Sequence, residues 1–394
     1  MGDNKENCKT LFVINIGNHT NMRDKIVRII SFQNAQNYGA ILQAFGLYKV
    51  IERMGFADVR FINYNPNYLK KRYNLFSLFT HFNEYSTVVK LKYILTLPFI
   101  LYYRNKRNNA ISKSRRNLIK QTSVELHNLD DINNERCDYL ICGSDQIWST
   151  WITHTPDPVF YGKGNYLGIQ KCIAYAPSSE ISTFQNESNI VLIKDYLKGF
   201  DAISVREERI KKEIQKLTEK EVSLCVDPTI LCGADDFLEV ASNRIVKNPY
   251  VVVYAYNPYD PLINKIINSI PSVENYEVHY LTFGSLGLKS LTNDKLHAEV
   301  GIEDFLSFFK FASYVVTNSF HGLAFSLLFE KPFNVGFVEG ISGRVESLLF
   351  QLGLNDRLIK DNNISWSPID FNLVKSTLTK IREDSMSYLE NSLL

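Results

Sequence analysis

The stretch CDYLICGSDQIW, residues 137–148, decides the fold class, because a short apolar run ends directly in a polar turn. Residues 139–142 predict a buried β-strand, and the turn follows where that strand would end. The same succession recurs in IISFQNAQNYGA (29–40) and in YVVTNSFHG (314–322), each time before a helical pattern. Strands that alternate with helices in this way predict an α/β fold with parallel sheets covered by helices.

The chain is long enough for two such units, since its 394 residues compare with about 100–200 residues in a usual domain. We predict two lobes, 22–200 and 201–370, with a central cleft between them, and a C-terminal helix, 371–394. Residues 1–21 are interpreted as an N-terminal extension. Residues 67–127 lack strand signals and are interpreted as a helical, basic insertion in the first lobe.

The composition excludes several classes of protein. Apolar residues make up 45% of the chain and charged residues 22%, which is typical of a globular protein rather than a disordered one. The chain has 44 Lys and Arg against 42 Asp and Glu, so its net charge of +2 gives no reason to expect a nucleic-acid partner. The six cysteines form no CxxC pair, so neither a zinc site nor a thioredoxin-like motif is expected.

The same sequence features predict a cytoplasmic protein. The apolar run 11–16 is too short for the hydrophobic region of a signal peptide. Several cysteines lie inside apolar runs, where free thiols act as small core residues, and this fits a reducing compartment.

One apolar segment, 88–103, raises the question of membrane contact. Lys90, Lys92 and Pro98 interrupt it, so it falls short of the 18 or so unbroken apolar residues of a spanning helix. Two interpretations stay open. The segment either touches anionic lipid at the inner face of the membrane as a peripheral anchor, or is an ordinary helix with a solvated charged end. The basic residues that follow it are Arg104, Lys106, Arg107, Lys113, Arg115 and Arg116.

The turn after the first predicted strand carries side chains suited to sugar hydroxyls. Asn34, Asn37 and Tyr38 offer amide and hydroxyl groups, and Gly39 follows them at the start of a helix. Free backbone N–H groups at such a helix start can receive an acidic or hydroxylated ligand. The alternative is that these residues only form the turn and cap the helix.

The turn at 143–148 supplies a candidate base. Asp145, with the hydroxyl of Ser144 beside it, would lie at a strand end in the cleft and could deprotonate a sugar hydroxyl. The alternative is a helix cap. Trp148 could stack on a sugar ring or fill the core.

The turn at 317–322 has the outline of a phosphate site. A strand, a small polar turn and a helix start bring backbone amides and the helix dipole to one place, and Ser319 adds a hydroxyl. His321 can transfer a proton near neutral pH. Asn318, Phe320 and Gly322 complete the turn.

Two arginines are candidate partners for an anion. Arg206 follows the predicted strand 202–205, and Arg344 lies in the second lobe. A guanidinium binds carboxylate or phosphate through two parallel hydrogen bonds. For Arg206 the alternative is a local ion pair with Glu207, Glu208 or Asp227. The stretch Asp227-Pro-Thr is interpreted as a structural turn.

Together these segments resemble the polysaccharide pyruvyl transferase family. Each is weak alone, but they occur in the family's order over roughly residues 26–355. The matching stretches are NYGAILQ (37–43), CDYLICGSDQIW (137–148), SVRE (204–207), VDPT (226–229), TNSFHG (317–322) and FEKPF (329–333). The N-terminal extension and residues 67–127 match no motif of the family.

The resemblance implies two Rossmann-like lobes, as in the GT-B fold. It also implies transfer of the enolpyruvyl carbons of phosphoenolpyruvate to two hydroxyls of one sugar, which forms a cyclic ketal and releases phosphate. The acceptor would belong to a surface polysaccharide, such as a capsule or exopolysaccharide, or to its lipid-linked precursor. Arg206 and His321 fall on the family's donor positions. We assign the first lobe to the acceptor and the second to the donor.

As hypotheses, His321 is the acid that protonates the donor, and Asp145 is the base. Arg206, Arg344 and the 318–322 turn would bind the donor, and no metal or cofactor is expected. The alternatives are a GT-B glycosyltransferase that uses a nucleotide sugar, and a non-catalytic glycan-binding protein.

Overall fold

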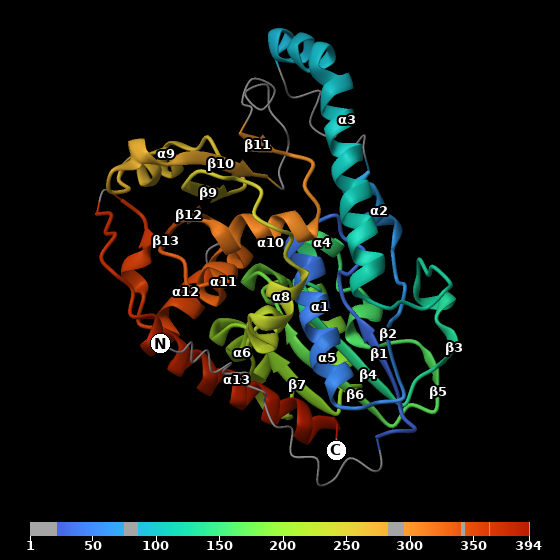
Figure 1. Ribbon diagram of the computed structural model, residues 1–394. Helices are drawn as coiled ribbons and strands as arrows, with labels where there is room; N and C mark the ends of the chain where they lie inside the picture. The colour runs from blue at the N-terminus through green and yellow to red at the C-terminus, as the bar shows by residue number, and fades with distance from the viewer. Residues whose placement is uncertain (1–21, 75–85, 283–294, 340–342, 362, 394) are drawn as a thin grey trace, which may run out of the picture.

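The computed structural model describes most of the chain as two α/β lobes that lie against each other (Figure 1). The predicted extension at 1–21 lies outside the described residues, and so does part of the predicted insertion. The described residues are 22–74, 86–282, 295–339, 343–361 and 363–393.

A six-stranded parallel sheet forms the N-terminal lobe. Its order is β2-β1-β4-β6-β7-β8, and all its pairings are parallel, with Ile29 of β1 opposite Ile141 of β4. The strands are β1 (Ile26–Ile30), β2 (Asp58–Phe61), β4 (Tyr139–Asp145), β6 (Lys171–Pro177), β7 (Ala202–Val205) and β8 (Val222–Leu224). A separate small ribbon pairs β3 (Asn133–Arg136) with β5 (Asn165–Leu167).

This sheet corrects the boundary predicted between the lobes. Residue 201 was expected to begin the second lobe, but β7 pairs with β6 and β8 pairs with β7. The N-terminal sheet therefore continues to Leu224, because two further βα units extend its edge. Arg206, which follows β7, belongs to the N-terminal lobe rather than the C-terminal one.

A second six-stranded parallel sheet forms the C-terminal lobe. Its order, β11-β10-β9-β12-β13-β14, is the usual Rossmann order, with three strands on each side of the point between β9 and β12 where the strand order reverses. Two Rossmann-like lobes, as predicted, are therefore confirmed. The strands are β9 (Tyr250–Tyr254), β10 (Glu277–Leu281), β11 (Leu296–His297), β12 (Tyr314–Thr317), β13 (Phe333–Gly336) and β14 (Leu358–Ile359).

Helices cover both sheets and fill the junction between the lobes. Most residues of α1 and α10 are buried, and α6 and α9 are amphipathic. They are α1 (Tyr38–Arg53), α2 (Asn67–Tyr73), α3 (Thr87–Leu118), α4 (Thr150–Thr153), α5 (Glu187–Leu197), α6 (Glu208–Gln215), α7 (Pro228–Cys232), α8 (Asp235–Val240), α9 (Pro261–Asn268), α10 (Ile302–Phe311), α11 (Phe320–Leu328), α12 (Gly343–Gln351) and α13 (Phe371–Leu393).

The lobes share one continuous apolar core. Strand residues alternate between faces, so Ile29 and Ile141 pack on one side of the N-terminal sheet and Ile30 and Leu140 on the other. The first side joins α1 and α7 to α10 and α11 of the C-terminal lobe in a single cluster of buried side chains. The relative position of the lobes is therefore set by core packing.

The C-terminal helix α13 crosses from the C-terminal lobe back to the N-terminal sheet, as predicted (Figure 1, red). The hydroxyl of Tyr388 donates to the carbonyl of Ala174 in β6 at 2.9 Å. The backbone N–H of Val226 donates to Ser385 Oγ at 3.0 Å. These contacts, with the buried Leu389, fasten the helix beneath the junction of the lobes.

Helices α2 and α3 occupy the described parts of the predicted insertion. The residues after α3 run beside β2 through isolated bridges from Phe61 to Gln121 and from Tyr64 to Leu126. Within the described residues, no helix is both long enough and apolar enough to cross a membrane.

The docking of α13 can be tested with two leucines of the same helix. Leu389 is fully buried, whereas Leu373 is 62% exposed. Leu389→Ala should lower the free energy of unfolding by about 2–5 kcal/mol, since it leaves a cavity in the core. The matched Leu373→Ala should change it by less than about 0.5 kcal/mol. Urea unfolding measures both, and equal effects would contradict the docking.

Candidate active site

The strand orders of both sheets direct the search to one place. A ligand site lies where the strand order reverses, beyond the carboxyl ends of the strands. In the N-terminal sheet the reversal falls between β1 and β4, and in the C-terminal sheet between β9 and β12. The turns after β1, β4 and β12 are the ones that the sequence singled out.

Arg206 is the central charged residue of this region. It follows β7, is only 5% exposed, and donates through Nη1 to Asp227 Oδ2 and through Nε to Glu207 Oε1, at 3.4 Å for the second bond. Its guanidinium carbon lies 4.7 Å from the ring centre of Phe320 in the other lobe. The remaining Nη2 is buried without a hydrogen-bond partner.

Asp227 holds this arginine in place. It caps α7, where its Oδ1 accepts from the backbone N–H of Thr229 at 2.9 Å. Burial would raise the pKa of Asp227, but the charges of Arg206 and His321 outweigh burial and hold that pKa below its ordinary value. Asp227 is therefore an anion at neutral pH, and the ion pair that the sequence left as an alternative for Arg206 is confirmed.

His321 faces the same carboxylate from the C-terminal lobe. Its Nε2 lies 3.9 Å from Asp227 Oδ2 and, although buried, has no hydrogen-bond partner. Burial lowers the pKa of His321, Asp227 and Asp145 act against that shift, and Arg206 and Arg344 add to it. The net direction is downward from the ordinary 6.5, so the imidazole is mostly neutral at pH 7.

Gly39 makes room for that imidazole. A Cβ added to Gly39 would lie 2.1 Å from Nδ1 of His321, closer than any side-chain contact allows. Gly39 was predicted to bind the acceptor; the structure places it as the surface on which His321 rests.

The first turn of α11 is a candidate place for an anion. Its N-cap, Ser319, makes no side-chain capping bond, whereas Asn37 caps α1 through Ala40. Free N–H groups and the helix dipole at such an end favour a negative ligand. A Cβ on Gly322 would lie 2.1 Å from Thr317 Oγ1, so glycine permits α11 to start this close to β12.

The side chain of Asn318, in the same turn, stabilises the C-terminal lobe by a hydrogen bond. Its Oδ1 accepts from the backbone N–H of Tyr256 at 3.0 Å, which ties the turn after β12 to the segment after β9. The amide oxygen that was predicted to bind the donor is therefore already used within the C-terminal lobe.

A cavity of about 190 Å³ borders the ion pair of Arg206 and Asp227, and residues of α12 and α13 also line it. Arg206 and Asp227 line it from the N-terminal lobe, and Phe320 and Arg344 from the C-terminal lobe. Both predicted arginines thus border one space between the lobes.

Asp145 lies at the end of β4 and belongs to the same electrostatic cluster. Its charge raises the pKa of both Arg206 and His321. Its φ of 67° is left-handed, a conformation that costs a non-glycine residue about 1–3 kcal/mol and occurs often at functional sites. The geometry leaves Asp145 available as the base but does not place it against a substrate.

Most of the predicted acceptor residues have structural contacts instead. Trp148 is buried, donates through Nε1 to the carbonyl of Phe160 at 3.2 Å, and stacks on Tyr161 with ring centres 4.9 Å apart. No face of the indole is left for a sugar ring, so the core interpretation of Trp148 replaces the binding one. Ser144 is fully buried and donates to the carbonyl of Ala176 at 2.5 Å.

Side chains of the amide-rich turn after β1 are likewise hydrogen-bonded within the protein. Asn34 donates to Asn63 Oδ1 and to the carbonyl of Tyr64, both at 3.0 Å. Tyr38 donates to the carbonyl of Val300 at 2.9 Å and stacks on Phe305 of the other lobe. The structure therefore assigns Asn34 to a turn and Tyr38 to the contact between lobes, because their polar groups are paired within the protein. Asn37, the cap of α1, remains half-buried.

Two functional candidates escaped the sequence interpretation. Asp227 was interpreted as a turn residue and as one alternative ion-pair partner of Arg206, and Glu207 only as such a partner; neither was predicted as a functional residue. Glu207 is buried, accepts from Ser178 Oγ at 2.7 Å, and has an Oε2 without a partner. Asp227 follows the strand next to the one that delivers Arg206, and that adjacency of strand ends was the available signal.

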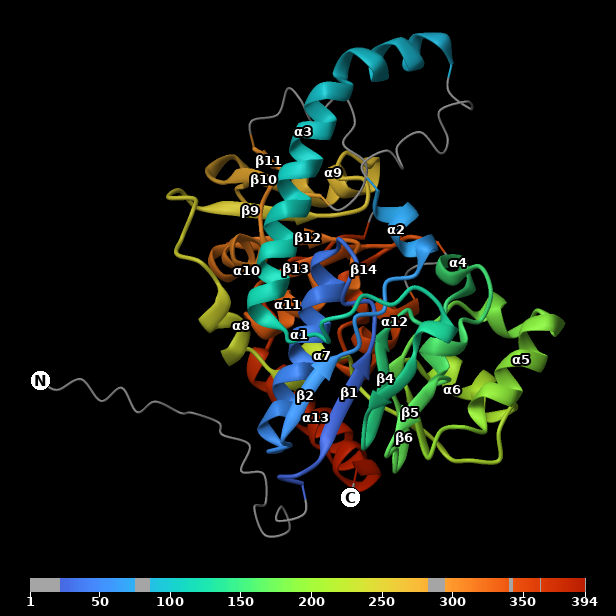
Figure 2. The ribbon, with the colours of Figure 1, turned by 90° about the vertical axis from the view of Figure 1, so that its right-hand side faces the viewer.

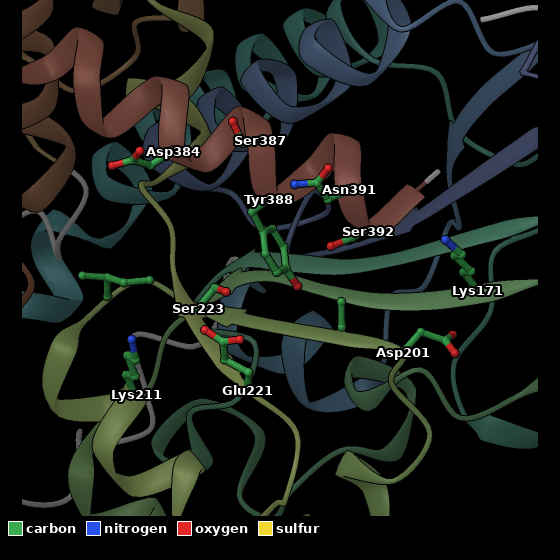
Figure 3. Close-up of a pocket in the computed structure, with 12 residues that line it drawn as sticks. Lys171, Asp201, Lys211, Glu221, Ser223, Asp384, Ser387, Tyr388, Asn391 and Ser392 are labelled. Atoms are coloured by element: carbon green, nitrogen blue, oxygen red, sulfur yellow. The ribbon is translucent and has the colours of Figure 1, made fainter. Parts of the chain in front are cut away.

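A larger cavity, of about 670 Å³, lies elsewhere, between α13 and the N-terminal sheet (Figure 3). Lys171 begins β6, and Asp201 and Glu221 directly precede β7 and β8, so this cavity opens at the amino ends of the strands. Its lining shares Leu224 and Asp384 with that of the smaller cavity, so the two cavities adjoin beside α13. Since α/β folds bind ligands at the carboxyl ends, we place the candidate site at the smaller cavity.

A search of the described residues finds no group of three His, Cys, Asp or Glu side chains that could hold a metal ion. The absence of a metal from the reaction stays a prediction.

The comparisons with known proteins agree with the sequence resemblance. The family model described as polysaccharide pyruvyl transferase matches residues 37–335. No curated protein matches the chain.

Similar solved structures are found at low identity and low TM-score. UDP-GlcNAc 2-epimerase from Methanocaldococcus jannaschii is 10% identical, covering 90% of this chain and 92% of that chain, with a TM-score of 0.45. UDP-GlcNAc 2-epimerase from Neisseria meningitidis bound to UDP-GlcNAc is 9% identical, covering 93% and 94%, with a TM-score of 0.41. The glycosyltransferase SnogD from Streptomyces nogalater is 11% identical, covering 94% and 98%, with a TM-score of 0.39.

The contribution of the buried Arg206–Asp227 ion pair to the free energy of unfolding can be measured with Asp227→Asn. Asparagine keeps the cap of α7 but leaves Arg206 without its main counter-charge, so the free energy of unfolding should fall by about 3 kcal/mol or more. Because the folded pKa of Asp227 is below its ordinary 3.8, this difference should be present above that pH and vanish as the pH falls further.

Asp195→Asn is the matched control for this measurement. Asp195 pairs with Lys163 and Lys198 at 60% side-chain exposure, where solvent screens the ion pair and its contribution to stability is small. Denaturant unfolding at pH 7 measures both variants. An Asp227→Asn loss no larger than that of the control would contradict the structural role of the pair.

Proposed function

The chain belongs to the polysaccharide pyruvyl transferase family, and on this premise we propose that it transfers the enolpyruvyl group of phosphoenolpyruvate to a sugar. Two hydroxyls of one sugar residue receive the group, a cyclic pyruvate ketal forms, and phosphate leaves. The acceptor is a residue of a surface polysaccharide or of its lipid-linked precursor. Membership of the family supports the polysaccharide acceptor; the donor is argued from the site.

The observation that carries the proposal is the cavity between the lobes that Arg206 and Arg344 both line. Arg206 Nη2 is buried without a partner, and so is Nε2 of His321, which lies 3.9 Å from Asp227 in the lining of that cavity. Unpaired buried donors cost free energy unless a ligand pairs with them. Phosphoenolpyruvate, with about three negative charges on a phosphate and a carboxylate, is complementary to two guanidiniums and an open helix end.

Binding of phosphoenolpyruvate converts the neutral imidazole of His321 into an imidazolium that can act as an acid. In the free protein the pKa of His321 is lowered by burial. A polyanion bound beside it favours the imidazolium and raises that pKa, so donor binding takes up a proton. His321 then protonates the methylene carbon of the donor, which becomes the methyl group, and C2 acquires oxocarbenium character.

The sugar completes the reaction in two bond-forming steps. Asp145 takes the proton of the first hydroxyl as its oxygen bonds to C2. The bond from C2 to the phosphate oxygen then breaks, and phosphate leaves with the N-terminus of α11 as its binding place. The second hydroxyl bonds to C2 and closes the ketal, and its proton goes to the departing phosphate. Acid and base assistance each contribute about 100- to 10,000-fold to such a step.

We place this activity in the cytoplasm. All five cysteines in the described part of the chain are free and buried, which fits a reducing compartment.

The donor can be identified by a thermal-shift titration followed by a phosphate assay. Phosphoenolpyruvate should raise the melting temperature and UDP-sugars should not, because only a ligand bound by the folded state stabilises it. Phosphate should then be released from phosphoenolpyruvate in the presence of one of a panel of galactosides, glucosides and mannosides. Stabilisation by UDP-sugars alone would indicate the glycosyltransferase alternative, and glycan binding without phosphate release the non-catalytic one.

His321→Gln tests the acid and its coupling to the donor. Turnover at saturating donor should fall about 100- to 10,000-fold. Calorimetry in buffers of different ionisation enthalpy should show proton uptake when the wild-type protein binds phosphoenolpyruvate at pH 7, and loss of this uptake in the variant. Donor affinity of the wild type should weaken as the pH rises through the pKa of the bound-state imidazole.

His127→Gln is the control, since His127 lies on the surface beside Glu125. It should keep both turnover and proton uptake. If His321→Gln kept them too, His321 would not be the acid.

A further inference from the structure

The first half of α3 extends beyond both lobes in both views of the molecule (Figures 1 and 2, cyan). We name residues 86–106 the arm. The arm exposes large apolar side chains that a soluble surface helix usually turns inward. They are Leu91, Ile94, Leu95, Phe99 and Tyr102, each between 54% and 68% exposed.

These side chains form one stripe along the arm. Their separations of three, four, eight and eleven residues from Leu91 place them on a single face of a helix. Pro98 lies within the stripe, and a proline inside a helix bends it. The stripe ends at Lys90 on one side and at Arg104 and Lys106 on the other.

The rest of α3 holds the arm in a defined position. Ser114 Oγ donates to Glu303 Oε2 at 2.5 Å, and Arg107 Nη1 donates to the carbonyl of Thr282 at 3.3 Å. Ile100 packs on Ala298 of the C-terminal lobe. The arm therefore stands on a base that is fastened to the body of the protein.

The positive charge of α3 indicates which kind of surface the arm would bind. Its 32 residues contain eight Lys and Arg and no Asp or Glu. The remaining chain has 36 basic and 42 acidic residues, a net charge of −6, against +2 for the whole. An apolar stripe bracketed by positive charge is complementary to the headgroups and upper acyl chains of an anionic bilayer. A second copy of the chain would bring eight further positive charges against the first, which repel.

We propose that the arm docks the protein on an anionic membrane surface. Eleven uncharged residues, 93–103, lie between Lys92 and Arg104, fewer than the 20 or so that span a bilayer, so the arm lies in the interface.

Vesicle sedimentation of the full chain tests this docking without donor or acceptor. The protein should sediment with phosphatidylcholine vesicles that contain 30% phosphatidylglycerol, and not with phosphatidylcholine alone. The variant Ile94→Ser/Leu95→Ser/Phe99→Ser should lose at least tenfold in partitioning. The control Val191→Ser/Leu373→Ser/Phe350→Ser, at exposed sites of α5, α13 and α12, should keep it.

A second pair of variants isolates the charge. Lys90→Gln/Lys106→Gln should weaken binding to anionic vesicles about 20- to 30-fold, since each basic residue near the surface contributes about fivefold. Lys194→Gln/Lys212→Gln should not change it.

Several results would overturn the proposal. They are no sedimentation, equal sedimentation with neutral vesicles, unchanged binding of the stripe variant, or a dimer in light scattering that the stripe variant abolishes. Donor-dependent phosphate release with a water-soluble acceptor should stay unchanged in the stripe variant, so failure of the docking and failure of the proposed chemistry remain distinguishable.

Discussion

Arg206 and Asp227 form an ion pair shielded from water where the two lobes meet, and the candidate site is built around it. A buried pair of this kind must recover the cost of desolvating both charges through close contact and further hydrogen bonds. Thr229 supplies one such bond to Asp227, and Phe320 covers the guanidinium from the other lobe. The one guanidinium nitrogen left unpaired is the group that a bound anion would satisfy.

The shared core keeps the opposing parts of the site in register. Tyr38 of α1 stacks on Phe305 of α10, and the next residue, Gly39, supports the ring of His321. Two consecutive residues of α1 therefore join the lobes and position the imidazole of His321. The side chains of the turn after β1, which had been predicted to bind sugar hydroxyls, are therefore largely paired within the protein.

The positions of Arg206 and His321 were more predictable than the contacts of the predicted acceptor residues, for a physical reason. Arg206 and His321 directly follow strands, and the strand-end rule of parallel sheets places them without knowledge of side-chain packing. Trp148 and Asn34 also follow strands, and Ser144 lies within the end of β4. Whether a polar group at these positions meets a ligand or another part of the chain depends on distant residues. For Trp148 the deciding partner is Phe160, and for Asn34 it is Tyr64.

The sequence by itself determined the α/β class, the two Rossmann-like lobes, the returning C-terminal helix and the family, because alternation of strands with helices and ordered motifs are local properties of a chain. The tertiary structure alone decided where the N-terminal sheet ends, since strand pairing placed β7 and β8 in it. It also decided that Asp227 pairs with Arg206 and that the apolar stripe of the arm is exposed. These depend on contacts between residues far apart in the chain, which no local pattern records.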